Sequence, residues 1–224
     1  MPKTFKGDVT NNVVELNLLD GNIGTLPDLG TPTIITKNTG PNVVQQIVGD
    51  IPANEFTLDN TLKGLVIGTS CTVIGSSAFY YCGNITGNLV IPDSVTTIQG
   101  TSPFGGAFIG CTGFTGDLVI PDSVTIIGDY AFGTCTGFDG HLVIPYSVTS
   151  IGSSAFLYCT SLTAAYINRP ASSWVGSNAL GLTSSLTNIY VHADYVAGYD
   201  AAWKTAQGTS ATVSTWTNYP NPTP

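Results

Sequence analysis

Apolar and polar positions follow a pattern that recurs along the middle of the chain. The apolar triplet Leu-Val-Ile returns at regular intervals, with its leucine at Leu65, Leu89, Leu118 and Leu142. The intervals are 24, 29 and 24 residues, so the pattern has nearly one period. A fixed period of this length is typical of a solenoid, in which each repeat forms one coil and buries its apolar side chains against its neighbours.

The first half of each repeat predicts a short strand that ends at a proline. In one such strand Leu89 and Ile91 point to one side and Val90 points to the other. Proline cannot donate a hydrogen bond to a sheet, so it ends the strand. The prolines in question are Pro92, Pro121 and Pro145. A second apolar pair, Val95 and Ile98 in this repeat, then returns to the core.

The second half of each repeat predicts a turn followed by a compact segment. A glycine after the core isoleucine is expected to permit a tight turn. These glycines are Gly75, Gly128 and Gly152. An Ala-Phe pair comes next, for which we expect a single helical or 3₁₀ turn. No repeat can bury its own apolar residues, so stacking at roughly 4.8 Å per strand must bury them.

About six repeats of 23–24 residues occupy residues 46–192, and the outer repeats match the pattern less well. The long interval has a local cause. Ile98 precedes Phe108 by ten positions, whereas Ile127 precedes Phe132 by five, so one repeat carries a five-residue insertion. Solenoids tolerate such an insertion, because a longer edge loop leaves the stacking register unchanged.

The repeated motif L-x-IP-x-SV-T-x-IG-x-x-AF-x-x-C-x-x-L resembles the BspA-type leucine-rich repeat, which is found in bacterial surface proteins and in some viral and protist proteins. The resemblance covers about residues 50–192, and IYVHADYVAGYDAAW resembles the closing segment common after such repeats. It implies a mainly β solenoid with short helical or 3₁₀ turns. The first 45 residues do not share the resemblance.

The start of the chain does not follow the repeat pattern. Residues 1–45 predict a small β segment that caps the solenoid or anchors the chain to another body. VVELNLL alternates as a strand does, the Asp-Gly-Asn that follows is a turn signal, and TIITK predicts a partner strand. The alternatives of cap and anchor remain open from the sequence.

The end of the chain predicts a helical cap and a tail. Residues 193–208 predict one helix with Asp194 as its N-cap and Gly208 as its stop. One face of that helix would cover the last coil, with Tyr195, Tyr199, Ala202 and Trp203. Residues 209–224 are polar and rich in proline, which predicts an extended tail whose Trp216 and Tyr219 could instead dock on a partner.

Composition excludes several classes of function. Charged residues make up 9% of the chain, the net charge is −8, and no lysine or arginine occurs between Lys63 and Arg169. Nucleic acid and anionic membranes both require basic groups, so neither is an expected partner. No run of 18 apolar residues exists, and the N-terminus lacks the apolar core of a signal peptide, so we expect no membrane insertion and no ordinary leader.

The five cysteines fall at repeat positions. Cys71 occupies the position that valine holds in the next three repeats, so it is expected to act as a small apolar residue. The others form a ladder at one position, namely Cys82, Cys111, Cys135 and Cys159. We expect buried free thiols, with the disulfides Cys82–Cys111 and Cys135–Cys159 as the alternative, because ladder spacing fits a disulfide. Metal binding is disfavoured, because a ladder does not converge on a tetrahedron.

Residues able to perform chemistry are few. His141 falls at a variable position and His192 at a junction, so neither predicts a catalytic base. Asp93 and Asp122 stack in register, but we expect them to cap turn amides rather than act as an acid–base pair in a glycan-active enzyme. The sequence holds no common nucleophile or phosphate-loop motif. We therefore predict no catalytic site, no cofactor and no metal.

The most informative surface is the outer side of the first strand. The middle residue of each apolar triplet is expected to face outward, which predicts a candidate interaction stripe of Val66, Val90, Val119, Val143 and Tyr166. A contiguous apolar stripe often marks an interface, although the N-terminal segment could cover it instead. The stripe is a candidate contact for a homo-oligomer and for a protein or glycan on a surface. Tyrosines near the Ala-Phe turns add groups suited to recognition.

Two classes of function fit these observations. The first is a non-enzymatic display or recognition protein, as a virion fibre or decoration component or as a surface adhesin. The virion is favoured because a virion protein needs no leader, and the distinct N-terminal segment could attach it to a particle. The alternative is a soluble intracellular scaffold for protein interactions, which reduced thiols would fit equally well.

Overall fold

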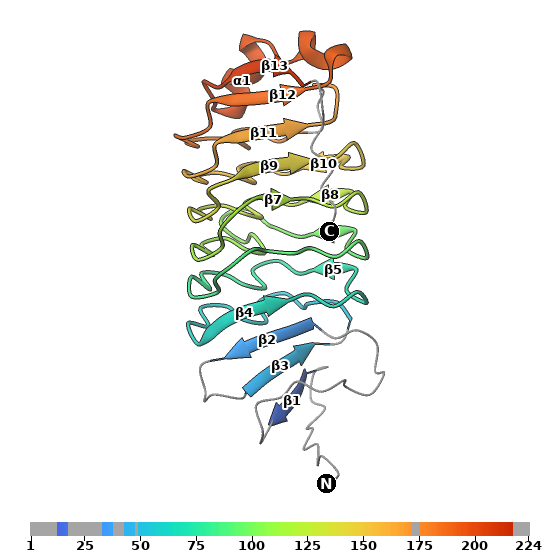
Figure 1. Cartoon of the computed structure of the whole chain (residues 1–224), viewed down its shortest axis with the longest axis vertical. Coiled ribbons are helices and arrows are strands. Elements are labelled where there is room, and N and C mark those ends of the chain that lie inside the picture. Colours follow the sequence, from blue (N-terminus) through green and yellow to red (C-terminus); the bar gives the residue numbers. More distant parts are fainter. Residues whose placement is uncertain (1–12, 18–32, 38–42, 48, 172–174, 217–224) are drawn as a thin grey trace.

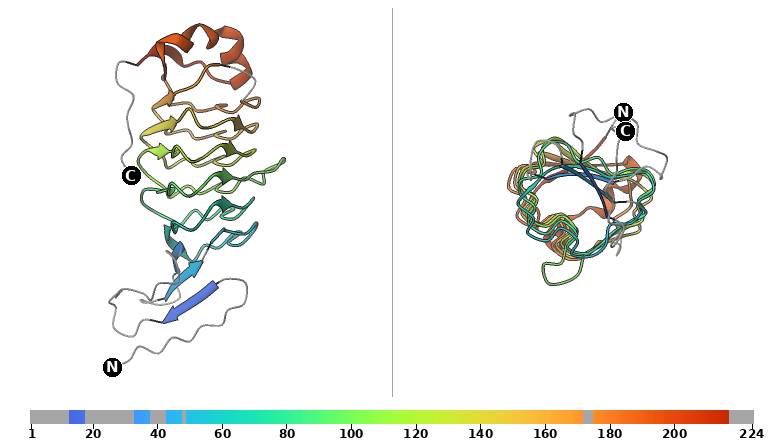
Figure 2. Two further views of the ribbon diagram at one scale, coloured as in Figure 1. Left: turned by 90° about the vertical axis from the view of Figure 1, so that its right-hand side faces the viewer. Right: turned by 90° about the horizontal axis from the view of Figure 1, so that it is seen from below.

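The computed structural model describes residues 13–17, 33–37, 43–47, 49–171 and 175–216. The coils stack along one axis into an elongated solenoid (Figure 1). Seen along that axis, the coils superimpose on one another around a common core (Figure 2). The predicted repeat solenoid is therefore confirmed.

The apolar triplets form the first face of the solenoid. We use the name sheet one for the parallel sheet on this face. Its strands stack in the order β13-β12-β11-β9-β7. Their bounds are β7 (Leu118–Val119), β9 (His141–Ile144), β11 (Ala164–Ile167), β12 (Asn188–Val191) and β13 (Thr212–Thr215). Leu142 pairs with Leu118 on one side and with Ala165 on the other. Equivalent residues of successive coils therefore lie side by side.

The second apolar pair of each repeat forms a second parallel sheet, sheet two, in the order β10-β8-β6-β5. Its strands are short: β5 (Val73–Ile74), β6 (Thr97–Ile98), β8 (Ile126–Ile127) and β10 (Ser150–Ile151). The Ala-Phe segments close the coil on a third side. They are single turns with bonds between residues three apart, such as Cys82 N–H to the Phe79 carbonyl at 3.2 Å.

The N-terminal segment extends the solenoid with an antiparallel sheet. Its strands are β1 (Val13–Asn17), β2 (Thr33–Lys37), β3 (Val43–Ile47) and β4 (Leu62–Val66), in the order β1-β3-β2-β4. The expected pairing of VVELN with TIITK is wrong, because β3 lies between β1 and β2 and pairs with both. β3 also spans the expected boundary at residue 45. β2 pairs with β4, the first solenoid strand, so the sheet is continuous with the stack.

The C-terminal end differs from the single helix predicted over residues 193–208. A 3₁₀ helix, η1 (Ala193–Gly198), precedes α1 (Ala201–Gln207). The N-cap of α1 is Asp200, which accepts the Trp203 N–H at 2.8 Å, rather than Asp194. Gly208 ends α1 with φ 67°, as predicted. The expected extended tail begins with β13, which pairs in parallel with β12; Tyr219 lies outside the described residues.

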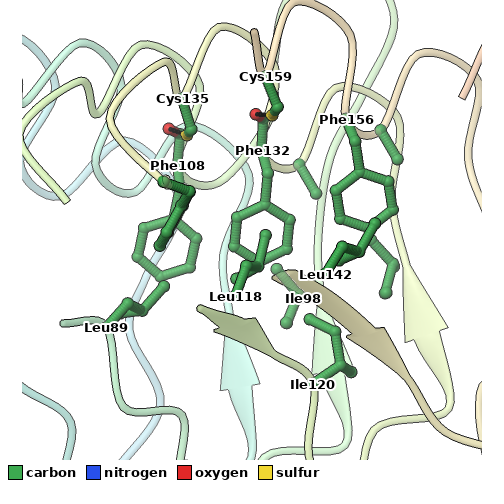
Figure 3. Close-up of a cluster of buried hydrophobic side chains, with 14 of the residues drawn as sticks. Leu89, Ile98, Phe108, Leu118, Ile120, Phe132, Cys135, Leu142, Phe156 and Cys159 are labelled. Atoms are coloured by element: carbon green, nitrogen blue, oxygen red, sulfur yellow. Dashed lines mark hydrogen bonds between the residues drawn. The ribbon is translucent and has the colours of Figure 1, made fainter. Parts of the chain in front are cut away.

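The core contains a stack of phenylalanine rings from five successive coils, and Figure 3 shows three of them, Phe108, Phe132 and Phe156. Neighbouring rings lie 5.2–5.6 Å apart between centroids and nearly parallel. The rings belong to Phe56, Phe79, Phe108, Phe132 and Phe156. All are buried, so each ring covers the faces of its neighbours and excludes water from them.

The cysteine ladder is part of this core and contains free thiols, as expected. Each ladder thiol donates to the carbonyl of a phenylalanine one coil earlier, as Cys135 Sγ does to Phe108 O at 3.0 Å. Burial raises the pKa of Cys159 to about 12 and raises the pKa of Cys135 well above its ordinary value. Protonated thiols that satisfy backbone carbonyls have a structural part rather than a reactive one.

The repeat glycines are required for space rather than for a left-handed turn. A Cβ on Gly152 would lie 2.5 Å from the carbonyl carbon of Gly128, and a Cβ on Gly75 would lie 2.8 Å from Ala53 Cα. None of Gly75, Gly128 and Gly152 has a positive φ. The expected turns are present, as Ala78 N–H to the Gly75 carbonyl at 3.2 Å shows, but the backbone angle is not what requires glycine. Successive coils approach so closely there that only a hydrogen fits.

Candidate interaction surfaces

The outer face of sheet one carries the stripe predicted from the apolar triplets. The parallel pairing places Val119, Val143 and Tyr166 in adjacent positions on β7, β9 and β11. Val66 and Val90 belong to the preceding coils and are 58% and 62% exposed. Two large aliphatic side chains therefore face solvent at the N-terminal end of this face.

The stripe is not open along its whole length, because Val143 lies in register with Val119 and Tyr166 but is covered. Val143 is only 3% exposed, although it lies outside the main core cluster. Val119 and Tyr166 are half-buried. The solvent-exposed part of the stripe is thus confined to Val66 and Val90, with Val119 at its margin.

The C-terminal half of the same face is aromatic. The Tyr166 and Tyr190 rings stack with centroids 4.9 Å apart, and the His141 ring meets Tyr166 edge-on at 5.5 Å. Sequence reasoning omitted Tyr190 from the stripe, although it follows Tyr166 by 24 residues and so shares its repeat position. Equal spacing was the signal that could have found it.

The two histidines are each paired with a nearby aspartate. Asp117 Oδ1 lies 3.3 Å from His141 Nδ1 and accepts the His141 backbone N–H at 2.7 Å. His192 Nδ1 lies 3.3 Å from Asp194 Oδ2 and accepts the Asp194 N–H at 3.3 Å. Both pairs are local contacts at the edges of strands. The arrangement serves to fix neighbouring backbone and brings neither imidazole to a serine or cysteine nucleophile among the described contacts.

The structure does not support the capping expected of Asp93 and Asp122. Both side chains are exposed, and neither carboxylate accepts a hydrogen bond from another described residue. Within the described residues, no group of three or more His, Cys, Asp or Glu side chains could hold a metal ion. None of the helices in the described part of the chain is long and apolar enough to cross a membrane.

A ladder of threonines runs beside sheet two. Each hydroxyl donates to the carbonyl of the threonine one coil earlier: Thr96 to Thr72 at 3.2 Å, Thr125 to Thr96 at 3.3 Å and Thr149 to Thr125 at 3.0 Å. At the N-terminal end of this ladder, Asp50 supplies the acceptor. Its Oδ1 accepts the N–H and hydroxyl of Thr72 at 2.7 and 2.8 Å and the Val73 N–H at 2.8 Å.

The Asp50 contacts at this end of the ladder are expected to make the free energy of unfolding depend on pH in the acidic range. Partial burial alone would raise the pKa of Asp50, but its hydrogen bonds with Thr72 and Val73 lower it below the ordinary value of 3.8. A lowered pKa in the folded state contributes stability that is present above the unfolded value and is lost as the pH falls through the folded value. The Asp50→Asn variant should therefore unfold at a lower urea concentration than wild type near neutral pH.

The difference should shrink as the pH falls below 3.8, the ordinary pKa of the group. Asp122→Asn is the matched control, because no described residue donates to that carboxylate, so its unfolding midpoint should track wild type throughout. A constant difference between Asp50→Asn and wild type down to the lowest pH would contradict the assigned contacts.

A third surface is formed by the Ala-Phe turns, at the second residue after each core phenylalanine or its equivalent. We call these six positions the turn column: Leu58, Tyr81, Gly110, Thr134, Tyr158 and Leu182. All six have a positive φ, between 54° and 76°. The N–H groups of the first five hold neighbouring coils together, as in Tyr81 to the Ile109 carbonyl at 2.7 Å and Tyr158 to the Gly181 carbonyl at 3.0 Å.

The turn column exposes large side chains at both ends. Leu58 is 59% exposed, Tyr81 45%, Tyr158 44% and Leu182 56%. The sequence pointed to tyrosines near the Ala-Phe turns but not to their shared register with leucines. It gave no sign of the left-handed backbone either, because that conformation usually selects glycine or asparagine.

Comparison with known proteins agrees with the solenoid. A crystal structure of a leucine-rich repeat protein from T. pallidum has a TM-score of 0.54 at 21% identity, covering 75% of this chain and 79% of that one. A leucine-rich repeat protein from Bacteroides ovatus gives 0.32 at 18% identity, covering 82% and 70%. A leucine-rich cell surface protein from Faecalibacterium prausnitzii gives 0.36 at 16% identity, covering 86% and 72%.

No curated protein sequence matches the chain significantly. Residues 42–112 and 105–198 match the family described as BspA type leucine-rich repeat region, in six copies. The matched residues include most of the chain and all of the coils that carry the phenylalanine stack. The chain belongs to the BspA-type leucine-rich repeat family.

Proposed function

We propose that this chain is a non-enzymatic recognition and display protein that binds a protein or glycan partner through the open end of the stripe on sheet one. The observation that carries the proposal is the exposure of Val66, at the end of β4, and of Val90, on the next coil, at 58% and 62%. Exposed aliphatic side chains at adjacent coils are typical of an interface rather than of free surface.

The chemistry of the chain favours binding over catalysis. The histidines form local pairs with aspartates, and the exposed Asp93 and Asp122 lack the hydrogen bonds that would position a general acid or base. With no lysine or arginine between Lys63 and Arg169, the partner is not nucleic acid. The partner is instead a surface protein or a glycan.

The test places a photo-reactive amino acid at position 90 and, as a control, at position 126. Ile126 is 43% exposed on sheet two, so it is a comparable aliphatic residue on another face. Crosslinked partners identified by mass spectrometry from position 90 alone support the proposal. The Val90→Lys variant should then weaken binding to that partner by about tenfold or more, and Ile126→Lys should not. Equal crosslinking from both positions would contradict it.

The setting we favour is a virion fibre or decoration protein, or a surface adhesin. In that setting residues 1–45 attach the chain to the particle, so their deletion should abolish incorporation and leave the solenoid folded. The alternative is an intracellular scaffold. Detection of the chain in purified particles or on intact cells by protease shaving supports the first setting, and recovery from the cytosol alone supports the second.

A further inference from the structure

The turn column reads nearly the same in both directions. From the N-terminal to the C-terminal coil it carries leucine, tyrosine, glycine, threonine, tyrosine and leucine. The two large pairs enclose two small residues, Gly110 and Thr134. With coils roughly 4.8 Å apart, the column extends over about 24 Å and has its centre between the two small residues. Such a surface is its own complement under a two-fold rotation.

The large residues of this column are held in an unfavourable conformation. Leu58, Tyr81, Tyr158 and Leu182 have φ values of 59°, 54°, 61° and 55°. A left-handed backbone is an outlier for bulky residues, and it persists only where surrounding structure enforces it. Folding alone would be served better by glycine, as Gly110 shows at the same repeat position. The backbone conformation therefore does not account for the choice of bulky side chains at these positions.

The same face is almost uncharged. In the turn segments of the five coils from Tyr81 to Leu182, the one charged side chain is Asp129, and its Oδ1 accepts the Ser153 N–H at 2.7 Å. The first coil of the column adds Glu55 and Asp59, which flank Leu58. The whole chain has a net charge of −8, so two copies repel one another through most other surfaces. Under a two-fold rotation Glu55 and Asp59 meet the turn around Leu182, which carries no charge, so apposition of two turn columns brings no like charges together.

Two further contacts enlarge and stiffen the apolar surface. The Tyr81 ring meets the Tyr80 ring at 4.7 Å and covers Gly110, where an added Cβ would lie 2.7 Å from ring carbons. Phe104 of the inserted segment is 56% exposed and meets the Tyr130 ring at 5.1 Å. That segment forms a loop outside the superimposed coils in the end-on view (Figure 2). Aromatic residues held in this way are typical of interface anchors.

We infer that the turn column is the contact between two copies of this chain, arranged antiparallel about a two-fold axis that passes between Gly110 and Thr134. In this dimer Leu58 faces Leu182 of the second copy, and Tyr81 faces its Tyr158. The contact lies on a different face from the stripe on sheet one, so a dimer presents two copies of the proposed binding surface.

The test measures the mass of the full chain by sedimentation equilibrium and light scattering over a range of concentrations. Wild type should reach the mass of a dimer. Tyr158→Gly should weaken the dimer by about 30-fold or more, the size expected for loss of an aromatic anchor. Because φ is 61° at this position, glycine keeps the fold, and the urea midpoint of the monomer should not fall. Val90→Lys is the control and should leave the dimer intact.

The orientation is tested by cysteine crosslinking, because all five native cysteines are buried. The double variant Leu58→Cys, Leu182→Cys should form disulfide-linked dimers on mild oxidation, and the single variants should form few. A monomer at every concentration, a dimer that survives Tyr158→Gly, or a dimer dissociated by Val90→Lys would overturn the inference. Each of these results leaves the binding test of the proposed function unaffected.

Discussion

Replacing Phe132 by alanine is expected to lower the free energy of unfolding by about 3–5 kcal/mol. Phe132 is fully buried and lies between two other rings, with centroids 5.4 Å from Phe108 and 5.6 Å from Phe156. Alanine removes the ring and leaves a cavity between three coils, because close stacking of the backbone prevents the coils from collapsing into it. At roughly 2–4 °C per kcal/mol, the thermal midpoint should fall by about 6–20 °C.

The control for this prediction is the same change at the end of the stack. Phe56 is also buried, but it is the first ring of the described stack, in which its neighbour is Phe79 at 5.3 Å. Phe56→Ala should therefore cost less than Phe132→Ala in urea or thermal unfolding. An equal or larger loss at Phe56 would show that the ring stack does not carry the stability that we assign to it.

The solenoid could be predicted from the sequence because its information is periodic. Each coil occupies nearly the same environment as the next, so residues that recur at one interval must lie side by side. That reasoning predicted the stacked coils, and it identified Cys71, which is fully buried, as a substitute for valine. A one-dimensional repeat needs no knowledge of long-range topology.

The ends of the chain could not be predicted in this way. The order β1-β3-β2-β4 depends on which strands meet after long connections, and the alternation of side chains carries no information on that order. The split of residues 193–208 into η1 and α1 depends on Asp200, whose carboxylate competes with Asp194 as a cap. Local capping signals were present for both residues, and tertiary packing selected one.

The candidate surfaces show the same limit. Alternation predicted that the middle residue of each triplet points outward, but it could not predict that Val143 would be covered while Val90 stays open. The turn column was missed for another reason. Preference for a left-handed backbone is inferred from glycine and asparagine, and here leucine and tyrosine adopt it under the constraint of stacked coils.

The second large effect is expected at a glycine in the stacking contact. Gly152→Ala should lower the free energy of unfolding by about 3 kcal/mol, at the upper end of the cost of overpacking. The added Cβ would lie 2.5 Å from the carbonyl carbon of Gly128, and backbone cannot move aside as a flexible side chain can. The strain cannot be relieved locally, because sheet one and the Ala-Phe turns fix the same two coils on the other sides.

The matched control is Gly133→Ala, another buried glycine of the solenoid. There the nearest atoms to an added Cβ are Tyr130 O at 3.3 Å and Ile109 Cγ1 at 3.4 Å, so the methyl group nearly fits. The free energy of unfolding of this variant should differ from that of wild type by about 1 kcal/mol or less. If both variants lost the same stability, the glycines would act through helix or turn preference rather than through coil spacing. A large loss at Gly152 alone means that the glycines, which have no side chain, set the distance between coils. That distance in turn sets the register of every surface ladder.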